Sequence, residues 1–186
     1  MINQAMQDVK NTKGIIIDLR HPIDVIRWNN TINWWYYFIA PYLTAAPVEF
    51  AQKSIANIQI PGLFTNETQK AGVRNRTHYK GKIVVLVDRN TNYNGQLTAI
   101  MLRALPNSVT VGSAIVLDGR DNNIFSSFQL PCNFCGGIPG NGLYFPDGSD
   151  ISDVGIVPDI EVKPTIRGIK EGRDEVIERA IKIINE

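Results

Sequence analysis

The sequence predicts one α/β domain in which a mainly parallel sheet is flanked by helices. Two runs, residues 14–20 and 82–88, are continuously apolar, rich in β-branched side chains and polar at their ends. Continuous rather than alternating apolar runs are typical of strands covered on both faces, as in parallel sheets. A helical pattern and a third apolar run, residues 108–113, follow the second run. Strand, turn, helix and strand therefore succeed one another in the order that builds parallel sheets.

The length and charge of the chain are those of a single globular domain. Its 186 residues are 44% hydrophobic and 20% charged, and the formal net charge is +1, with Lys and Arg spread along the chain. No basic run marks a nucleic-acid or lipid surface, so we expect no nucleic-acid partner. The longest strongly apolar stretch, residues 34–41, is far shorter than the roughly 20 residues of a membrane span. We expect one domain over residues 1–186, with residues 1–13 as an N-terminal helix or tail.

Residues 28–43 are dense in aromatic side chains and predict a helix over residues 31–40. Such a helix would direct one set of side chains inward, namely Ile32, Trp35, Tyr36 and Ile39. It would leave another set for a different neighbour, namely Trp34, Tyr37 and Phe38. Aromatic residues at this density usually fill a core, and the alternative is a surface shared with a partner domain. Residues 44–79 are the least informative part of the sequence, with a turn predicted at residues 61–62 and a solvated loop at residues 74–78.

Two helices are predicted by the spacing of apolar residues. The interior helix precedes Pro106 and Asn107 and has an apolar face made of Leu97, Ile100, Met101, Ala104 and Leu105. The last helix begins near Gly172 and Asp174, and its predicted buried face is Val176, Ile177, Ala180, Ile181 and Ile184. Its outer face is expected to carry two i,i+4 ion pairs, Glu175 with Arg179 and Glu178 with Lys182. Shorter strands are predicted at residues 123–130 and 160–162.

The turn between the second strand and the interior helix is where the sequence predicts chemistry. In α/β enzymes ligands bind beyond the carboxyl ends of the strands, and a helix start offers N–H groups and a partial positive charge to an oxyanion. A nucleophilic serine at this helix start would also gain a neighbouring amide donor. Residues 92–95 are Asn92, Tyr93, Asn94 and Gly95, and none of them is a serine, cysteine or threonine.

The cysteines of the chain are Cys132 and Cys135, in the run LPCNFCGG. One CxxC pair supplies two ligands, whereas structural zinc takes four, and neither His21 nor His78 lies near the pair in sequence. We interpret the pair as ordinary loop thiols, with a local disulfide and a metal site as the alternatives. We therefore expect no metal and no cofactor.

Four segments carry a longer pattern: GIIIDLR, YKGKIVVLVDRNTN, LRALPNSVTVGS and LYFPDGSDISDVGIVPDIEVKPTIRGIKEGRDEVIERAI. In this order they resemble the carboxy-terminal processing (tail-specific) serine peptidases and the related tricorn core, over nearly the whole chain. The resemblance implies the spiral β-β-α superhelix shared with crotonases and ClpP-like proteases. It also implies peptide-bond hydrolysis by a serine, with a lysine base or a histidine-based tetrad. We expect the upstream domains of the family to be absent from this chain.

Most catalytic positions implied by the resemblance hold other residues here. The nucleophile position falls on Tyr93, and a glutamate three residues later falls on Gln96. The stretch AIVLDGRDNN, where lysine-base members carry their base, has no lysine. In the tricorn-like branch a carboxylate falls in the region of Ser152 and Asp153, and the histidine comes from strands upstream of GIIIDLR. The glycines that follow DLR and help to form the oxyanion hole are replaced by His21-Pro22-Ile23-Asp24.

The other polar residues near this edge are interpreted as cleft or structural residues. A phenol with a pKa of about 10 is little ionised near neutral pH, so Tyr93 is expected to cap or pack rather than attack. Cleft positions are assigned to Asn94, Gly95 and His21, and binding positions to Gly112 and Ser113, with Ser113 as nucleophile the less favoured alternative. We expect ion pairing at the strand end by Asp18 and Arg20, and capping of turns by Asp147 and Asp159.

Three functions are compatible with these residues. The favoured one is a peptidase-like domain without catalysis that binds a peptide or protein C-terminus or an apolar small molecule. The second is an active serine peptidase whose nucleophile lies elsewhere in the chain. The third is a structural module that pairs through an exposed sheet edge, for example as a homodimer. The resemblance also suggests the bacterial cell envelope as the location.

Overall fold

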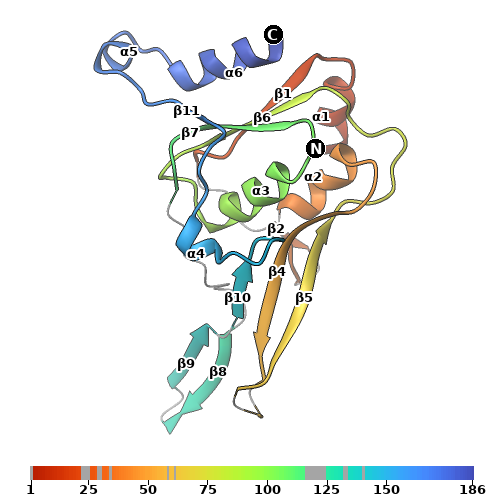
Figure 1. Cartoon of the computed structure of the whole chain (residues 1–186), viewed down its shortest axis with the longest axis vertical. Helices are drawn as coiled ribbons and strands as arrows, with labels where there is room; N and C mark the ends of the chain where they lie inside the picture. The colour runs from red at the N-terminus through yellow and green to blue at the C-terminus, as the bar shows by residue number, and fades with distance from the viewer. Residues whose placement is uncertain are drawn as a thin grey trace.

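The core of the structure is a parallel sheet between two helical layers. The computed structural model describes residues 2–21, 26–28, 31–33, 35–57, 59–60, 62–115, 125–131, 134–139 and 141–186. Four parallel strands lie in the order β1 (Gly14–Asp18), β6 (Lys82–Val87), β7 (Ser108–Gly112) and β11 (Ile160–Glu161). Helices α2 (Trp35–Leu43) and α3 (Tyr93–Arg103) lie on one face, and α6 (Glu175–Asn185) lies on the other (Figure 1). The predicted α/β class, with a mainly parallel sheet flanked by helices, is therefore confirmed.

Strand β6 is the centre of this core, as its continuous apolar sequence predicts. Every residue from 83 to 87 is 0% exposed. Because successive side chains of a strand point to opposite faces, alternate residues of β6 join two separate clusters. The odd-numbered residues pack with α3 residues such as Met101, whereas Val84 and Leu86 pack with α6 residues such as Ala180. Both helical layers are thus held by the same strand.

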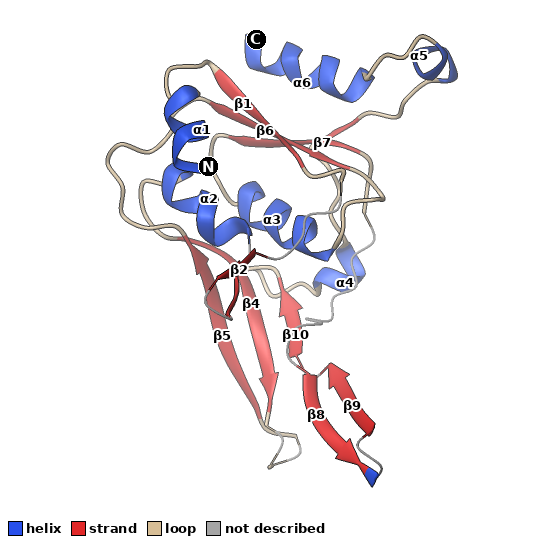
Figure 2. Cartoon of the chain, turned by 180° about the vertical axis from the view of Figure 1, so that it is seen from behind, coloured by secondary structure: helices blue, strands red, loops and turns tan. Residues whose placement is uncertain are grey.

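An antiparallel part of the chain extends away from the core as two hairpins (Figure 2). Strands β4 (Val48–Ala56) and β5 (Phe64–Ala71) form the first hairpin, and β10 (Asn141–Tyr144) pairs with the other side of β4. Strands β8 (Phe125–Leu130) and β9 (Phe134–Pro139) form the second and confirm the strand predicted near residues 123–130. Residues 44–79, the least informative part of the sequence, thus contain two long strands. Most side chains of β5 are exposed, so this strand lacks an apolar pattern that would predict it from the sequence.

The aromatic segment does not form one helix over residues 31–40. Strand β3 (Thr31–Asn33) pairs antiparallel with β2 (Ile26–Trp28), and α2 begins only at Trp35. Cross-strand pairing of the β-branched residues at 31 and 32 competes successfully with a helical pattern, because helix propensity is only a weak preference. The predicted inward position of Ile39 is confirmed by its packing against the core, and Tyr37 is 46% exposed. Trp34 and the side chains of residues 32, 35 and 36 lie outside the described parts of the structure.

The last helix follows the sequence pattern except on two points. Asp174 caps α6 as predicted, and its side chain accepts hydrogen bonds from the N–H groups of residues 176 and 177. The predicted burial of Ile181 is wrong, since this side chain is 49% exposed and Ile183 is buried instead. The two predicted i,i+4 ion pairs are also absent from this described helix. Glu175 instead accepts hydrogen bonds from Thr165, and Glu178 pairs with Arg173, because both partners are presented beside the first turn.

The described residues also form three short helices: α1 (Ile2–Asp8), α4 (Ile151–Val154) and α5 (Ile166–Lys170). The chain thus begins with a helix, within the helix or tail predicted for residues 1–13. Strands β1 and β11 form the two edges of the parallel sheet. Pairing of two copies of the chain through one of these edges stays a prediction. Among the described helices, none combines the length and apolar character needed to cross a membrane.

Candidate functional site

The carboxyl ends of the parallel strands bring most of the predicted site residues to one edge of the sheet. Asp18 lies beside Leu86, and Val87 lies beside Gly112. The turns that follow β1, β6 and β7 therefore emerge together, and they carry His21, the start of α3 and Ser113. A Cβ atom at Gly95 would lie 3.5 Å from the carbonyl oxygen of Leu19, which shows how closely the start of α3 approaches the end of β1.

The turn between β6 and α3 is held by its own polar groups. The carboxylate of Asp88 accepts hydrogen bonds from the backbone N–H and the side-chain amide of Asn90, at 2.8 and 3.1 Å. The hydroxyl of Thr91, which is 2% exposed, accepts a bond of 3.0 Å from the N–H of Asp88. These bonds form a compact turn of the kind that Asp and Asn favour. The buried Thr91 hydroxyl therefore serves the backbone of the turn.

The start of α3 is capped by Asn92, as expected for a helix that begins at residues 92–95. The side chain of Asn92 accepts a hydrogen bond of 3.0 Å from the N–H of Gly95. The side-chain amide of Gln96 donates a 3.0 Å bond to the carbonyl oxygen of Thr91, so this residue also stabilises the turn. The carbonyl oxygen of Asn94 accepts a bond from the hydroxyl of Thr98 at 2.8 Å. Tyr93 is the first residue of the helix, and its side chain lies outside the described parts.

Arg20 links the end of β1 to the start of α6 through two carboxylates. Its guanidinium donates to Asp18 at 2.9 and 2.7 Å and to Asp174 at 3.0 and 2.8 Å. The predicted pairing of Asp18 with Arg20 is thus confirmed, while Asp174 is a partner that lies 154 residues away. Burial alone would raise the pKa of Asp18, but the hydrogen bonds from Arg20 outweigh it and hold that pKa below its ordinary value of 3.8. The same guanidinium lowers the pKa of Asp174, and both carboxylates raise the pKa of Arg20.

Arg20→Gln is expected to lower the free energy of unfolding by about 1.5 kcal/mol at pH 7, because two bidentate ion pairs are lost from a partly solvent-screened site. The folded-state pKa values of Asp18 and Asp174 lie below 3.8, so this contribution is present above about pH 4 and disappears as the pH falls through the lowered values. Urea unfolding at pH 7 and near pH 2 measures both effects. Arg167→Gln, at an arginine with an 85% exposed side chain, is the control and should cost under about 0.5 kcal/mol. An unchanged difference between the wild type and Arg20→Gln across this pH range would contradict the assignment.

Gly112 and Ser113 end β7 at the same edge. Gly112 has a φ of +140°, and the N–H of Ser113 donates to the carbonyl oxygen of Val87 at 3.1 Å. The carbonyl oxygen of Gly112 accepts from the N–H of Val162 at 2.8 Å. The backbones of both residues therefore hold strands together at this edge, and the binding role of Gly112 and Ser113 stays a prediction.

The remaining predicted residues lie away from this edge of the sheet or outside the parts of the chain that the structure describes. Asp153 belongs to α4, but its side chain is not described. Cys132 lies outside the described residues, and Cys135 lies in β9 without a described side chain. The predicted capping of a turn is confirmed for Asp147, which accepts from the N–H of Ser149 at 2.9 Å. It is wrong for Asp159, whose carboxylate instead accepts at 2.8 Å from the N–H of Thr110 in strand β7, because the fold brings this strand beside it. Where side chains are described, no three His, Cys, Asp or Glu residues cluster in a way that could hold a metal ion.

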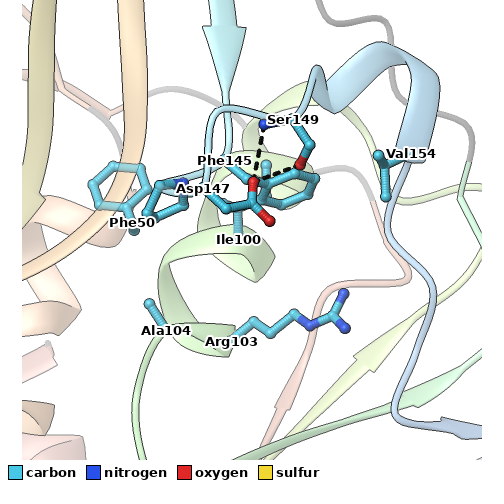
Figure 3. Close-up of a pocket in the computed structure, with 9 residues that line it drawn as sticks. Phe50, Ile100, Arg103, Ala104, Phe145, Asp147, Ser149 and Val154 are labelled. Atoms are coloured by element: carbon cyan, nitrogen blue, oxygen red, sulfur yellow. Dashed lines mark hydrogen bonds between the residues drawn. The ribbon is translucent and has the colours of Figure 1, made fainter.

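A cavity of about 420 Å³ lies at the other end of α3 and was missed by sequence reasoning (Figure 3). It is bounded by β4, the carboxyl half of α3, the turn after β10 and the end of α4. Its lining residues are Phe50, Ile100, Arg103, Ala104, Phe145, Pro146, Asp147, Ser149 and Val154. The turn PDG was visible in the sequence, but its contact with residues about 40 and 100 positions away depends on the tertiary fold.

Comparison with known proteins places these features in context. The sequence profile of peptidase family S41 matches residues 46–162, which is more than half of the chain. No curated protein matches the sequence.

Several solved structures have the same fold. A protein from Parabacteroides merdae that is described as a peptidase superimposes with a TM-score of 0.74 at 19% identity, over 98% of this chain and 55% of that one. Mature CPAF gives a TM-score of 0.69 at 16% identity, over 99% and 46% of the two chains. The photosystem II D1 C-terminal processing protease gives 0.60 at 17% identity, over 89% and 38%. This chain thus spans between 38% and 55% of the length of these three structures, and at such identities the similarity shows the fold alone.

Proposed function

The chain belongs to peptidase family S41, and from this membership we propose that the domain binds peptide segments at the carboxyl edge of its sheet without cleaving them. The observation that carries the proposal is the residue at the nucleophile position. In the resembled peptidases a serine opens the helix after the strand that corresponds to β6, and Tyr93 opens α3 here. In this proposal, proteolysis is the activity of the family from which the domain derives and is not the activity of the domain itself.

The surroundings of Tyr93 support this proposal. The helix start is occupied by Asn92, whose side chain caps the helix, and by Gln96, whose amide binds the turn. The hydroxyl nearest in sequence, that of Thr91, is buried and accepts a backbone N–H, so it is not presented to a substrate. The phenol of a tyrosine, with a pKa of about 10, is also a weak nucleophile at neutral pH unless a cation lowers that pKa.

A domain can bind a peptide without a nucleophile, and the carboxyl edge of the sheet has the groups that binding needs. The start of α3 supplies a partial positive charge, which attracts carbonyl oxygens and the terminal carboxylate of a peptide. The turns after β1, β6 and β7 surround it, in the place where α/β proteins bind ligands. That the protein acts in the bacterial cell envelope stays a prediction from the family resemblance.

Intact-mass spectrometry after incubation with a fluorophosphonate probe tests the absence of catalysis. We expect no adduct on the wild-type chain, because an unactivated hydroxyl reacts too slowly to be labelled to completion. A stoichiometric adduct on one serine, for example Ser113, would overturn the proposal and make the domain an active hydrolase.

Peptide binding is tested by isothermal titration with unstructured peptides that carry a free carboxylate. Saturable binding to the wild type is expected, and Ser113→Trp should weaken it by at least about tenfold because the new side chain fills the edge. Ile166→Trp, at a 76% exposed position on α5, is the matched control and should leave binding unchanged. The absence of measurable binding to any peptide would contradict the proposal.

A further inference from the structure

The cavity at the carboxyl end of α3 is lined mostly by apolar residues and is large enough to bind a small molecule. Its volume of about 420 Å³ lies within the roughly 300–1,000 Å³ of small-molecule sites. Phe50 and Ile100, which are 2% and 3% exposed, close its base, and the accessible apolar surface is that of the partly buried Phe145 and of Val154, which is 50% exposed. Such a surface favours the apolar part of a ligand through burial of hydrophobic surface.

Two opposite charges from separate elements reach into this apolar space (Figure 3). Arg103 ends α3 and has a half-exposed side chain. One of its terminal nitrogens lies 3.6 Å from a carboxylate oxygen of Asp159, a loose contact that occupies at most one of the five N–H donors of the guanidinium. The other donors of the guanidinium can bind a carboxylate.

The second charge is the carboxylate of Asp147, in the turn after β10. Its Oδ1 atom accepts both the N–H of Ser149 at 2.9 Å and the hydroxyl of Ser149 at 2.6 Å. These bonds orient the carboxylate and lower its pKa, so that it is charged at neutral pH. Because both bonds converge on one oxygen, the second oxygen can accept a proton donor from a ligand.

We propose that this cavity binds a short apolar zwitterion of about dipeptide size. The ammonium group of the ligand pairs with Asp147, its carboxylate pairs with Arg103, and its apolar side chains pack on Phe145 and Val154. A ligand with a single charge would pair with only one of the two protein charges, so it should bind more weakly. The inference is independent of the proposed function, because the cavity lies at the end of α3 and Tyr93 lies at its start.

The test is a titration of the ¹⁵N-labelled chain with the dipeptide leucyl-phenylalanine, followed by NMR. Saturable shifts are expected for the amides that border the cavity, and their dependence on concentration gives the dissociation constant. The N-acetylated dipeptide lacks the ammonium group and the dipeptide amide lacks the carboxylate, so both should bind more weakly. Shifts confined to the start of α3 would place the ligand at the edge of the sheet and overturn the inference.

Two variants match the two modified ligands. Arg103→Gln should weaken binding of the free dipeptide by about tenfold, because a guanidinium can bind a carboxylate through two N–H groups, and Asp147→Asn should weaken it by about threefold, because Asp147 is exposed to solvent. Arg103→Gln should then bind the dipeptide and its amide equally, and Asp147→Asn should bind the dipeptide and its acetylated form equally. Arg167→Gln is the control and should bind like the wild type. Equal affinity of the wild type for all three ligands, or no effect of either variant, would overturn the inference.

Discussion

Replacing Gly112 with alanine is expected to abolish the stable fold or to lower the free energy of unfolding by more than about 4 kcal/mol, at the upper limit of what single substitutions do. The residue has a φ of +140°, which side chains rarely adopt. A Cβ atom there would lie 1.9 Å from the carbonyl oxygen of Val87 and 3.0 Å from its carbonyl carbon. The obstructing atoms belong to the backbone of the central strand β6, so they cannot move aside without disturbing the sheet. Urea unfolding followed by circular dichroism measures the effect.

Gly172→Ala separates the steric clash from the cost of the backbone conformation. Gly172 also has a positive φ, +67°, but a Cβ atom there would have nothing within 4 Å. This variant should therefore cost only the roughly 1–2 kcal/mol of a left-handed residue. If the two variants lost the same stability, the close approach of Gly112 to Val87 would not be the cause.

Replacing Asp159 with alanine is expected to cost about 3 kcal/mol, because it leaves buried donors without partners. The carboxylate accepts the N–H and the hydroxyl of Thr110 at 2.8 and 2.7 Å, and Thr110 is 0% exposed. In return, the hydroxyl of Thr110 accepts the N–H of Asp159 at 2.9 Å. These bonds connect β7 with the segment that leads into β11. The contact of Asp159 with Arg103, at 3.6 Å and half-exposed, adds little.

Thr110→Val provides the matched control for this prediction. Valine keeps the shape of the side chain and removes the hydroxyl, so its own cost should be smaller, about 1 kcal/mol. In the double variant the two losses should not add, with a coupling of about 1 kcal/mol or more. Additive losses in urea unfolding would show that Thr110 and Asp159 act independently, contrary to the geometry.

The parallel sheet and its main helices were predictable because their signals are local. A run such as residues 82–88 is continuously apolar only if both faces of the strand are covered, and the structure buries both faces of β6. The spacing of apolar residues in α3 likewise required one buried face. The hairpin of β4 and β5 was not predictable in this way, since most β5 side chains are exposed and the strand is defined by hydrogen bonds to β4.

The candidate site likewise has a part that the sequence predicts and a part that only the tertiary structure shows. The start of α3 near residues 92–95 could be expected from the order of the residues alone, because a helix start is defined within one turn. That Tyr93 occupies the nucleophile position stays a prediction. The pairing of Asp18 with Arg20 could be expected from their spacing of two residues. The third member, Asp174, could not, because an ion pair across 154 residues depends on where α6 packs.

The sequence by itself thus determined the class of the fold, its central strand and the starts of its two main helices. Each of these features depends on residues within a few positions of one another. Because apolar side chains must be buried, their spacing in the sequence indicates the element that they form. Only the tertiary structure decided which distant segments meet: Arg20 with Asp174, Thr110 with Asp159, and Phe50 with Arg103 and Asp147 around one cavity. Contacts of this kind result from the packing of whole elements, so no local pattern in the chain encodes them.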